Sequence, residues 1–294
     1  MIGPPCAETL GTSFAVVTPT YLPDLARCEL LTESLDRVAP DVPHYLIVDR
    51  RDRSAFIHLE GGLRRIIESE SLIGKWMWQV PGTTGYWLSL KTFPVRGWII
   101  QQILKIGSVD AISEPTLIFC DSDTAFFRSF DRNNLLVDGK LGLLDVDYCS
   151  DVTVDWTRIA RRLLGLPIDE GGYRTHIGNM ICWDGSTVKA VRDRIESSTG
   201  MSWQVALARR QKFSEYMLYG VFVREILGYE NSPHAPSTVP LVKPSWGTAL
   251  DSDSAIAEFF RDFDSQTVAV MIHSKDGIDP ARYRHHLERL WDAI

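Results

Sequence analysis

The chain of 294 residues lacks several features that would define its class at once. It has no basic excess, because 31 Lys and Arg stand against 38 Asp and Glu, and no Lys/Arg run is longer than a pair. A nucleic-acid-binding protein is therefore not expected. No uncharged apolar stretch reaches the roughly 18 residues of a membrane-spanning helix, and MIGPPCAETL lacks the order of a signal peptide. We expect a cytoplasmic protein whose contact with a membrane, at its inner face, would be peripheral.

Cysteine is also scarce and unpatterned. The five cysteines, with no CxxC pair among them, are Cys6, Cys28, Cys120, Cys149 and Cys182. Their odd number and scatter favour reduced, mostly buried thiols over a disulfide framework. The nine tryptophans suit either a core or sugar-stacking surfaces, and composition does not choose between these.

The apolar pattern of the sequence predicts an alternation of strands and helices. A β-branched run at residues 14–18 stops at Pro19, and residues 24–38 then carry apolar side chains at helical spacing. The apolar run at 44–49 follows two prolines and ends in Asp49. This order predicts a βαβ unit with parallel strands.

The rest of the chain continues the same order. Further strands are predicted at 65–68, 116–120, 141–144, 177–183 and 268–273, and helices at 98–105, 187–197, 204–212, 214–227 and from Asp279-Pro280 onward. Segments 76–94 and 228–246 fit no element and are expected to be lids or binding loops. The strands on either side of them are expected to share one sheet. We expect a single α/β domain with a mostly parallel central sheet flanked by helices.

The stretch TLIFCDSDTAFF, residues 116–127, ends a buried strand with two acids, Asp121 and Asp123. The carboxyl ends of parallel strands are where open α/β sheets bind ligands. On extended backbone the two side chains share a face about 7 Å apart, and at about 4 Å they would repel by roughly 4 kcal/mol. A hard divalent cation, Mg²⁺ or Mn²⁺, would turn that repulsion into a binding site. The alternative is that both acids cap a turn.

This stretch, with Phe126-Phe127 after the acids, resembles the DxD motif of GT-A fold glycosyltransferases. The Gly97–Lys105 helix and Ser214-Glu215-Tyr216 also resemble bacterial polysaccharide and lipopolysaccharide glycosyltransferases. The resemblance implies a single Rossmann-like GT-A domain over 1–294, with a nucleotide-sugar half at about 1–130 and an acceptor half at about 131–294. It implies transfer of a sugar from a nucleotide-diphosphate sugar to a glycan or glycolipid hydroxyl, in bacterial surface polysaccharide biosynthesis.

The resemblance also implies roles for individual residues. The donor would be bound by Thr18 with the loop after it, Asp49, Gln102, Lys105, Asp121, Ser122 and Lys275. The metal would be held by Asp121, Asp123 and His273, and the acceptor by His176 and Asn179. Glu215, 94 residues beyond Asp121 and on the apolar face of its helix, would be the general base.

Each of these residues also has a structural interpretation. Asp49 can cap a turn paired with its arginines, Gln102 and Lys105 can lie on a solvated helix face, and Glu215 suits the first turn of a helix. His176, Asn179 and His273 can be core or turn residues. Asp145 and Asp147 repeat the acid spacing and are interpreted as a sugar contact and not as a second metal site.

Three other functions stay open. A phosphatase of the haloacid dehalogenase type also places two acids after a strand, but Ala125 stands where Thr or Val is expected and no later GDxxxD run exists. A nucleotidyltransferase would need a Gly-rich loop after the first strand, and none is present. A non-catalytic sugar-binding protein is the third.

Overall fold

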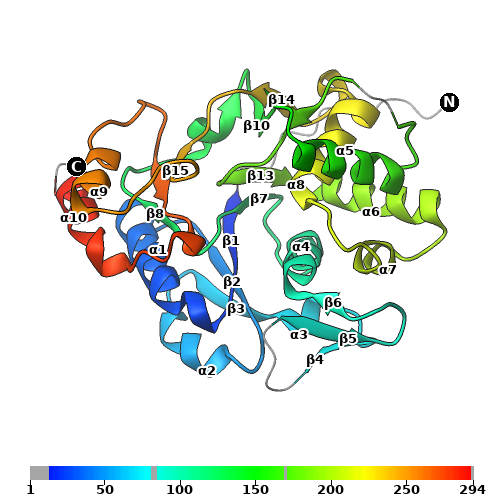
Figure 1. Ribbon diagram of the computed structural model, residues 1–294, viewed down its shortest axis with the longest axis horizontal. Coiled ribbons are helices and arrows are strands. Elements are labelled where there is room, and N and C mark those ends of the chain that lie inside the picture. The colour runs from blue at the N-terminus through cyan, green and yellow to red at the C-terminus, as the bar shows by residue number, and fades with distance from the viewer. Residues whose placement is uncertain (1–12, 81–84, 169–170, 293–294) are drawn as a thin grey trace.

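The computed structural model describes residues 13–80, 85–168 and 171–292, and its centre is a five-stranded sheet (Figure 1). The strands, in their order across the sheet, are β13 (Ile181–Asp184), β7 (Thr116–Phe119), β1 (Phe14–Thr20), β2 (His44–Val48) and β3 (Arg64–Glu68). All pairs are parallel except β13 with β7. The predicted α/β class with a mostly parallel central sheet is confirmed.

Both faces of this sheet are buried, as parallel strands require. Alternate residues point to opposite faces, so that Val17 packs with α4 (Gly97–Gly107) while its neighbour Val16 packs with α1 (Leu25–Val38). Figure 1 shows the two helices on opposite sides of the sheet. Pro19 is tolerated in β1 because β7 pairs with β1 only as far as Val17.

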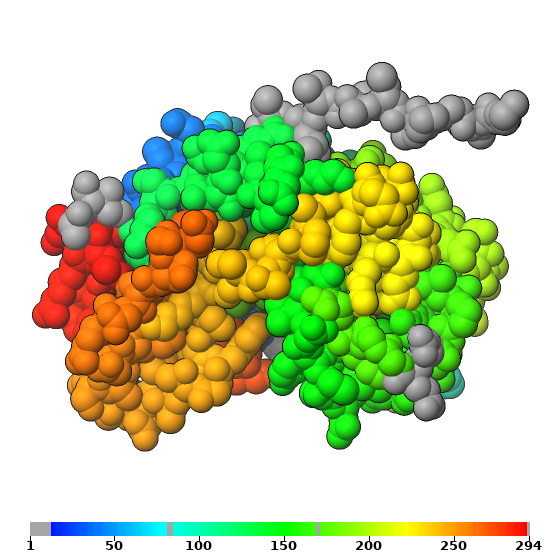
Figure 2. All heavy atoms as spheres, turned by 90° about the horizontal axis from the view of Figure 1, so that it is seen from above, coloured from blue at the N-terminus to red at the C-terminus, as the bar shows by residue number. Residues whose placement is uncertain are grey.

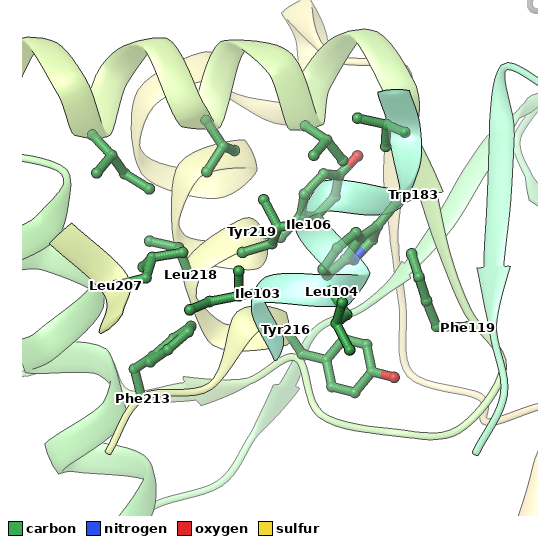
Figure 3. Close-up of a cluster of buried hydrophobic side chains, with 14 of the residues drawn as sticks. Ile103, Leu104, Ile106, Phe119, Trp183, Leu207, Phe213, Tyr216, Leu218 and Tyr219 are labelled. Atoms are coloured by element: carbon green, nitrogen blue, oxygen red, sulfur yellow. The ribbon is translucent and has the colours of Figure 1, made fainter. Parts of the chain in front are cut away.

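The largest apolar cluster lies on the α4 face (Figure 3). It adds side chains from α6 (Gly185–Thr199), α7 (Trp203–Ala208) and α8 (Glu215–Phe222). Trp183 stacks on Tyr219 of α8, with ring centroids 4.8 Å apart and an interplanar angle of 15°. Tyr216 lies at the margin of the cluster in Figure 3.

A second sheet begins directly after the acid pair. Its strands are β15 (Val242–Pro244), β16 (Ala269–Met271) and β8 (Thr124–Phe126), with β16 antiparallel to β8. α9 (Asp253–Phe259) and α10 (Arg284–Trp291) lie on the same side of the molecule (Figure 1). The expectation that the later strands extend one sheet was therefore wrong, and β16 instead delivers residues 272–274 to the acids.

The remaining described strands and α-helices are short or peripheral. They are the three-stranded sheet of β9 (Leu136–Val137), β10 (Lys140–Leu144) and β14 (His234–Ser237), the pair β11 (Val146–Asp147) and β12 (Arg174–Thr175), the sheet of β4 (Met77–Gln79), β5 (Tyr86–Ser89) and β6 (Val95–Arg96), and the helices α2 (Arg53–Phe56), α3 (Ser69–Leu72) and α5 (Asp151–Leu163). In Figure 2 the green and gold segments that contain β10 and β14 lie side by side. None of the helices in the described ranges could cross a bilayer.

Several elements were missed by the sequence patterns. Strands β4 and β5 fall in the unassigned segment 76–94, of which residues 81–84 lie outside the described residues, and β14 and β15 fall in 228–246. Helix α5 was not predicted, although Ser150 before it is a helix N-cap whose hydroxyl accepts from the Thr153 N–H. Cys6 also lies outside the described residues.

Gly220 in α8 provides a test of this packing. A Cβ at that position would lie 2.1 Å from Cγ of His176, so Gly220→Ala should lower the free energy of unfolding by about 1–3 kcal/mol through overpacking. Alanine's helix preference works in the opposite direction by up to about 1 kcal/mol. Urea unfolding measures the difference, with Gly171→Ala, whose Cβ would meet nothing within 4 Å, as control. A Gly220→Ala variant as stable as this control would refute the packing.

Candidate functional site

The acid pair lies at the switch point of the central sheet. β1 has β2 on one side and β7 on the other, and such a reversal of strand order opens a crevice at the carboxyl ends of the strands. Asp24 follows β1 in the 3₁₀-helix η1 (Leu22–Asp24), and Asp121 and Asp123 follow β7. Burial raises the pKa of the Asp24 carboxyl overall, although the nearby Ser122 side chain acts to lower it. Ser122, which was predicted to contact the nucleotide-sugar donor, is buried.

Lys105 of α4 joins Asp121 to the other side of the site. Its buried ammonium donates to Asp121 Oδ1 at 3.1 Å and to the Tyr216 hydroxyl at 2.9 Å, and it pairs with Glu215 Oε1 at 3.0 Å. Burial alone would lower the pKa of Lys105, but the charge of Asp121, with Tyr216 and Glu215, outweighs burial and raises that pKa well above its usual value. Lys105 is therefore a permanently charged centre.

Gln102, one turn earlier on α4, is also buried and has a structural role. Its amide donates to the Trp98 carbonyl at 3.2 Å, and its Oε1 accepts from the Glu215 N–H at 3.0 Å. It thereby satisfies an otherwise unpaired N–H at the start of α8. Neither Gln102 nor Lys105 lies on a solvated face, and Gln102 is not placed to contact a diphosphate.

Asp123 is held differently from Asp121. Its Oδ2 accepts from the Ser274 N–H at 2.9 Å, and its carbonyl accepts from the Ile272 N–H at 3.1 Å, next to the β8–β16 pairing. Its buried Oδ1 has no hydrogen-bond partner. Burial, and then the charge of Asp121, raise the pKa of Asp123 to about 7. A buried carboxylate oxygen without a partner is costly, so burial favours the neutral, protonated form of this carboxyl.

Residues 273–275, which were predicted to complete the site, do so only in part. Ser274 reaches Asp123, and Lys275 follows it, exposed, in η7 (Ser274–Asp276). His273 Nδ1 lies 4.0 Å from Asp276 Oδ1. Across the described ranges, no three His, Cys, Asp or Glu side chains gather as a metal-ligand group, so His273 is not assembled with Asp121 and Asp123 into one.

Arg27 is a site residue that the sequence patterns missed. From α1 its guanidinium donates to Asp24 Oδ1 at 3.3 Å and to the carbonyls of Ser274 and Ile278 at 3.4 and 3.2 Å. It fastens the late segment to the end of β1. The only signal in the sequence was its i,i+3 spacing from Asp24.

Two residues predicted to bind the nucleotide have partners within the protein. Thr18 is fully buried, and its hydroxyl lies 3.0 Å from His44 Nε2. Burial, with the charge of Arg64, lowers the pKa of His44 to about 3, so this pair is a neutral core contact. The role predicted for Thr18 is therefore corrected. Asp49 accepts from Gln79 Nε2 at 2.8 Å and lies 3.8 Å from Arg51, which is the turn role stated as its alternative.

The two residues predicted to bind the acceptor, His176 and Asn179, lie in different surroundings. His176 is buried against Gly220, and its Nδ1 lies 2.8 Å from the Leu144 carbonyl. It is a core residue and not a contact for sugar hydroxyls. Asn179 is partly exposed and lines, with Leu144 and Met180, a cavity of about 290 Å³.

The second acid pair, Asp145 and Asp147, already shares a cation. Arg174 forms ion pairs with both Asp145 and Asp147, and the Tyr229 hydroxyl donates to Asp145 Oδ2 at 2.6 Å. β11 and β12 place Asp147 directly opposite Arg174. Arg174 thus links β12 to β11, while the Asp147 side chain stays 85% exposed, and the sugar contact stays a prediction.

Fold and site together define an α/β protein whose charged residues gather at the switch point of a mostly parallel sheet. Residues 12–292 match a family of unknown function, DUF6492, and the chain belongs to that family. No curated protein matched the chain.

The raised pKa of Asp123 predicts a pH-dependent stability. Because the folded-state pKa of about 7 exceeds the ordinary 3.8, folding favours the protonated form, and this stabilisation is lost as the pH rises through about 7. In EDTA, raising the pH from about 5 to about 8 should lower the free energy of unfolding of wild type by about 2–3 kcal/mol more than that of Asp123→Asn. Urea unfolding at both pH values measures this, with exposed Asp251→Asn as control. Parallel pH dependences for wild type and Asp123→Asn would contradict the assignment.

Lys105→Met should cost roughly 3–5 kcal/mol of unfolding free energy, because Asp121 and Glu215 would lose their shared cation. Adding Glu215→Gln should recover part of that loss, with a coupling of about 1–3 kcal/mol. Urea unfolding of the two single variants, the double variant and exposed Lys189→Gln provides the measurement. A Lys105→Met cost no larger than that of Lys189→Gln would show that Lys105 does not anchor the site.

Proposed function

We propose that the protein is a metal-dependent glycosyltransferase that moves a sugar from a nucleotide-diphosphate sugar to a hydroxyl of a glycan or glycolipid. The observation that carries the proposal is the partnerless Oδ1 of Asp123, buried beside Asp121 at the switch point. The location supports a ligand site, and the unsatisfied oxygen supports a cation there.

The donor set fits Mg²⁺ or Mn²⁺. Mg²⁺ commonly takes one or two protein carboxylates and completes its shell with water and substrate phosphates, so Asp121 and Asp123 would suffice without His273. The Asp121 side chain is 38% exposed and stays open to a ligand. When bound, the ion would supply charge neutralisation for the leaving diphosphate. Lys105, bonded to Asp121 Oδ1, orients that carboxylate and adds positive charge next to it.

Glu215 has a further requirement if it is to serve as the general base. Its side chain is 6% exposed and its carboxylate already holds Lys105 at 3.0 Å. A base must reach the acceptor hydroxyl, so the Lys105 contact would have to break first. The arrangement favours a positioning role, in which Glu215 keeps the Lys105 ammonium directed at Asp121.

A ligand screen addresses the donor directly. Thermal unfolding should be followed with UDP, GDP, CMP and TDP sugars, each with Mn²⁺ and with EDTA, because a ligand that binds the folded state raises its apparent stability. A shift with one nucleotide class that requires Mn²⁺ supports the proposal. The absence of any Mn²⁺-dependent shift opposes it.

Asp121→Asn and Asp123→Asn should each reduce Mn²⁺-dependent donor hydrolysis or transfer by at least about 100-fold, because each removes a carboxylate charge from the cation site. Asp147→Asn, in the acid pair that shares Arg174, is the control of matched chemistry and should retain activity. Released nucleoside diphosphate is the measurement. Full activity in Asp123→Asn would defeat the assignment.

A further inference from the structure

An exposed apolar and basic surface lies at the sheet of β4, β5 and β6. A groove of about 800 Å³ runs between the loop after β5 and the end of α7. We define the β5 surface as its apolar residues Tyr86, Leu90 and Phe93 and its basic residues Lys91, Arg96 and Arg209. Phe93 is 91% exposed and Leu90 77%, the two largest values among the exposed large hydrophobic side chains of the described ranges.

The pleat of the small sheet extends this surface. Met77, Trp87 and Val95 are buried on one face, whereas Trp78 and Leu88, directly opposite each other, are exposed on the other. The outer face of an antiparallel sheet is usually polar. An outer face with tryptophan, leucine and tyrosine indicates a surface that meets an apolar environment.

The basic residues of the β5 surface are not neutralised. In the described ranges no carboxylate pairs with Lys91, Arg96 or Arg209, and no Asp or Glu lines the groove. Arg210, also in its lining, faces the like charges of Arg162 and Arg209. This is a local excess of positive charge on a chain whose net charge is −7.

We infer that the β5 surface docks on an anionic lipid bilayer. Leu90 and Phe93 enter the boundary between headgroups and acyl chains, while Lys91, Arg96 and Arg209 contact lipid phosphates. Nucleic acid would match the cations but would leave Leu90, which has no π face for a base, in water. A protein partner would not require so many unpaired charges of one sign.

Docking by this surface would bring the membrane to the candidate site. Gln79 of β4, next to Trp78, bonds Asp49 at the carboxyl end of β2. α4 runs from Arg96, its N-cap, to Lys105. α4, which Figure 1 shows beside β6, and the Gln79–Asp49 hydrogen bond thus join the surface to the switch point.

Vesicle cosedimentation tests the inference without any assay of transfer. The protein should sediment with vesicles of phosphatidylcholine mixed with phosphatidylglycerol, should bind phosphatidylcholine alone at least about tenfold more weakly, and should lose affinity as salt rises. Lys91→Gln/Arg209→Gln and Leu90→Ser/Phe93→Ser should each weaken binding to the anionic vesicles by roughly tenfold or more.

Matched controls use exposed residues elsewhere. Arg289→Gln on α10 and Leu63→Ser before β3 should bind as wild type, and circular dichroism confirms that all variants fold. Failure to bind anionic vesicles at low salt, or unchanged binding of either double variant, would overturn the inference. So would binding of an oligonucleotide in preference to vesicles, or a dimer that Leu90→Ser/Phe93→Ser dissociates.

Discussion

The buried ammonium of Lys105 is the constraint on which the site depends. A buried charge is tolerated only when it is paired and hydrogen-bonded, and Lys105 meets this condition by taking Asp121 from the end of β7 and Glu215 and Tyr216 from the start of α8. Three parts of the chain that are far apart in sequence are therefore fixed relative to one another by one charge. Gln102 adds a fourth contact on the same helix face, through the Glu215 N–H.

The two acids after β7 then acquire different properties from one local sequence. Asp121 has a cation and solvent, whereas Asp123 is enclosed beneath residues 272–274 and has backbone donors only. Two neighbouring carboxyls in different environments have different pKa values. The one with the raised pKa is therefore the one with an unsatisfied oxygen, and a divalent cation bound there would replace its proton at neutral pH.

Local patterns predicted much of the fold. Helix and strand periods placed α1, β2, α4 and β7 within a few residues, because each buries a regular apolar face. They missed the division of strands into separate sheets, since period alone does not specify strand partners. In the site, the sequence predicted the inward side chain of Glu215 but assigned His273 to the acids, whereas Ser274 is the residue that bonds Asp123. The roles of Thr18, Ser122 and His176 did not, because each depends on a partner distant in sequence.

The comparison of the two acid pairs shows why spacing alone cannot identify such a site. Asp145 and Asp147 have the same spacing as Asp121 and Asp123, but β12 lies alongside and places Arg174 opposite them. At the end of β7, the cation that bonds Asp121 is Lys105, which comes from α4 and not from a paired strand. Asp145 and Asp147 thus share Arg174, while Asp123 keeps a buried oxygen without a hydrogen-bond partner. Strand topology, and not the motif, therefore gives two acid pairs of equal spacing different electrostatic surroundings.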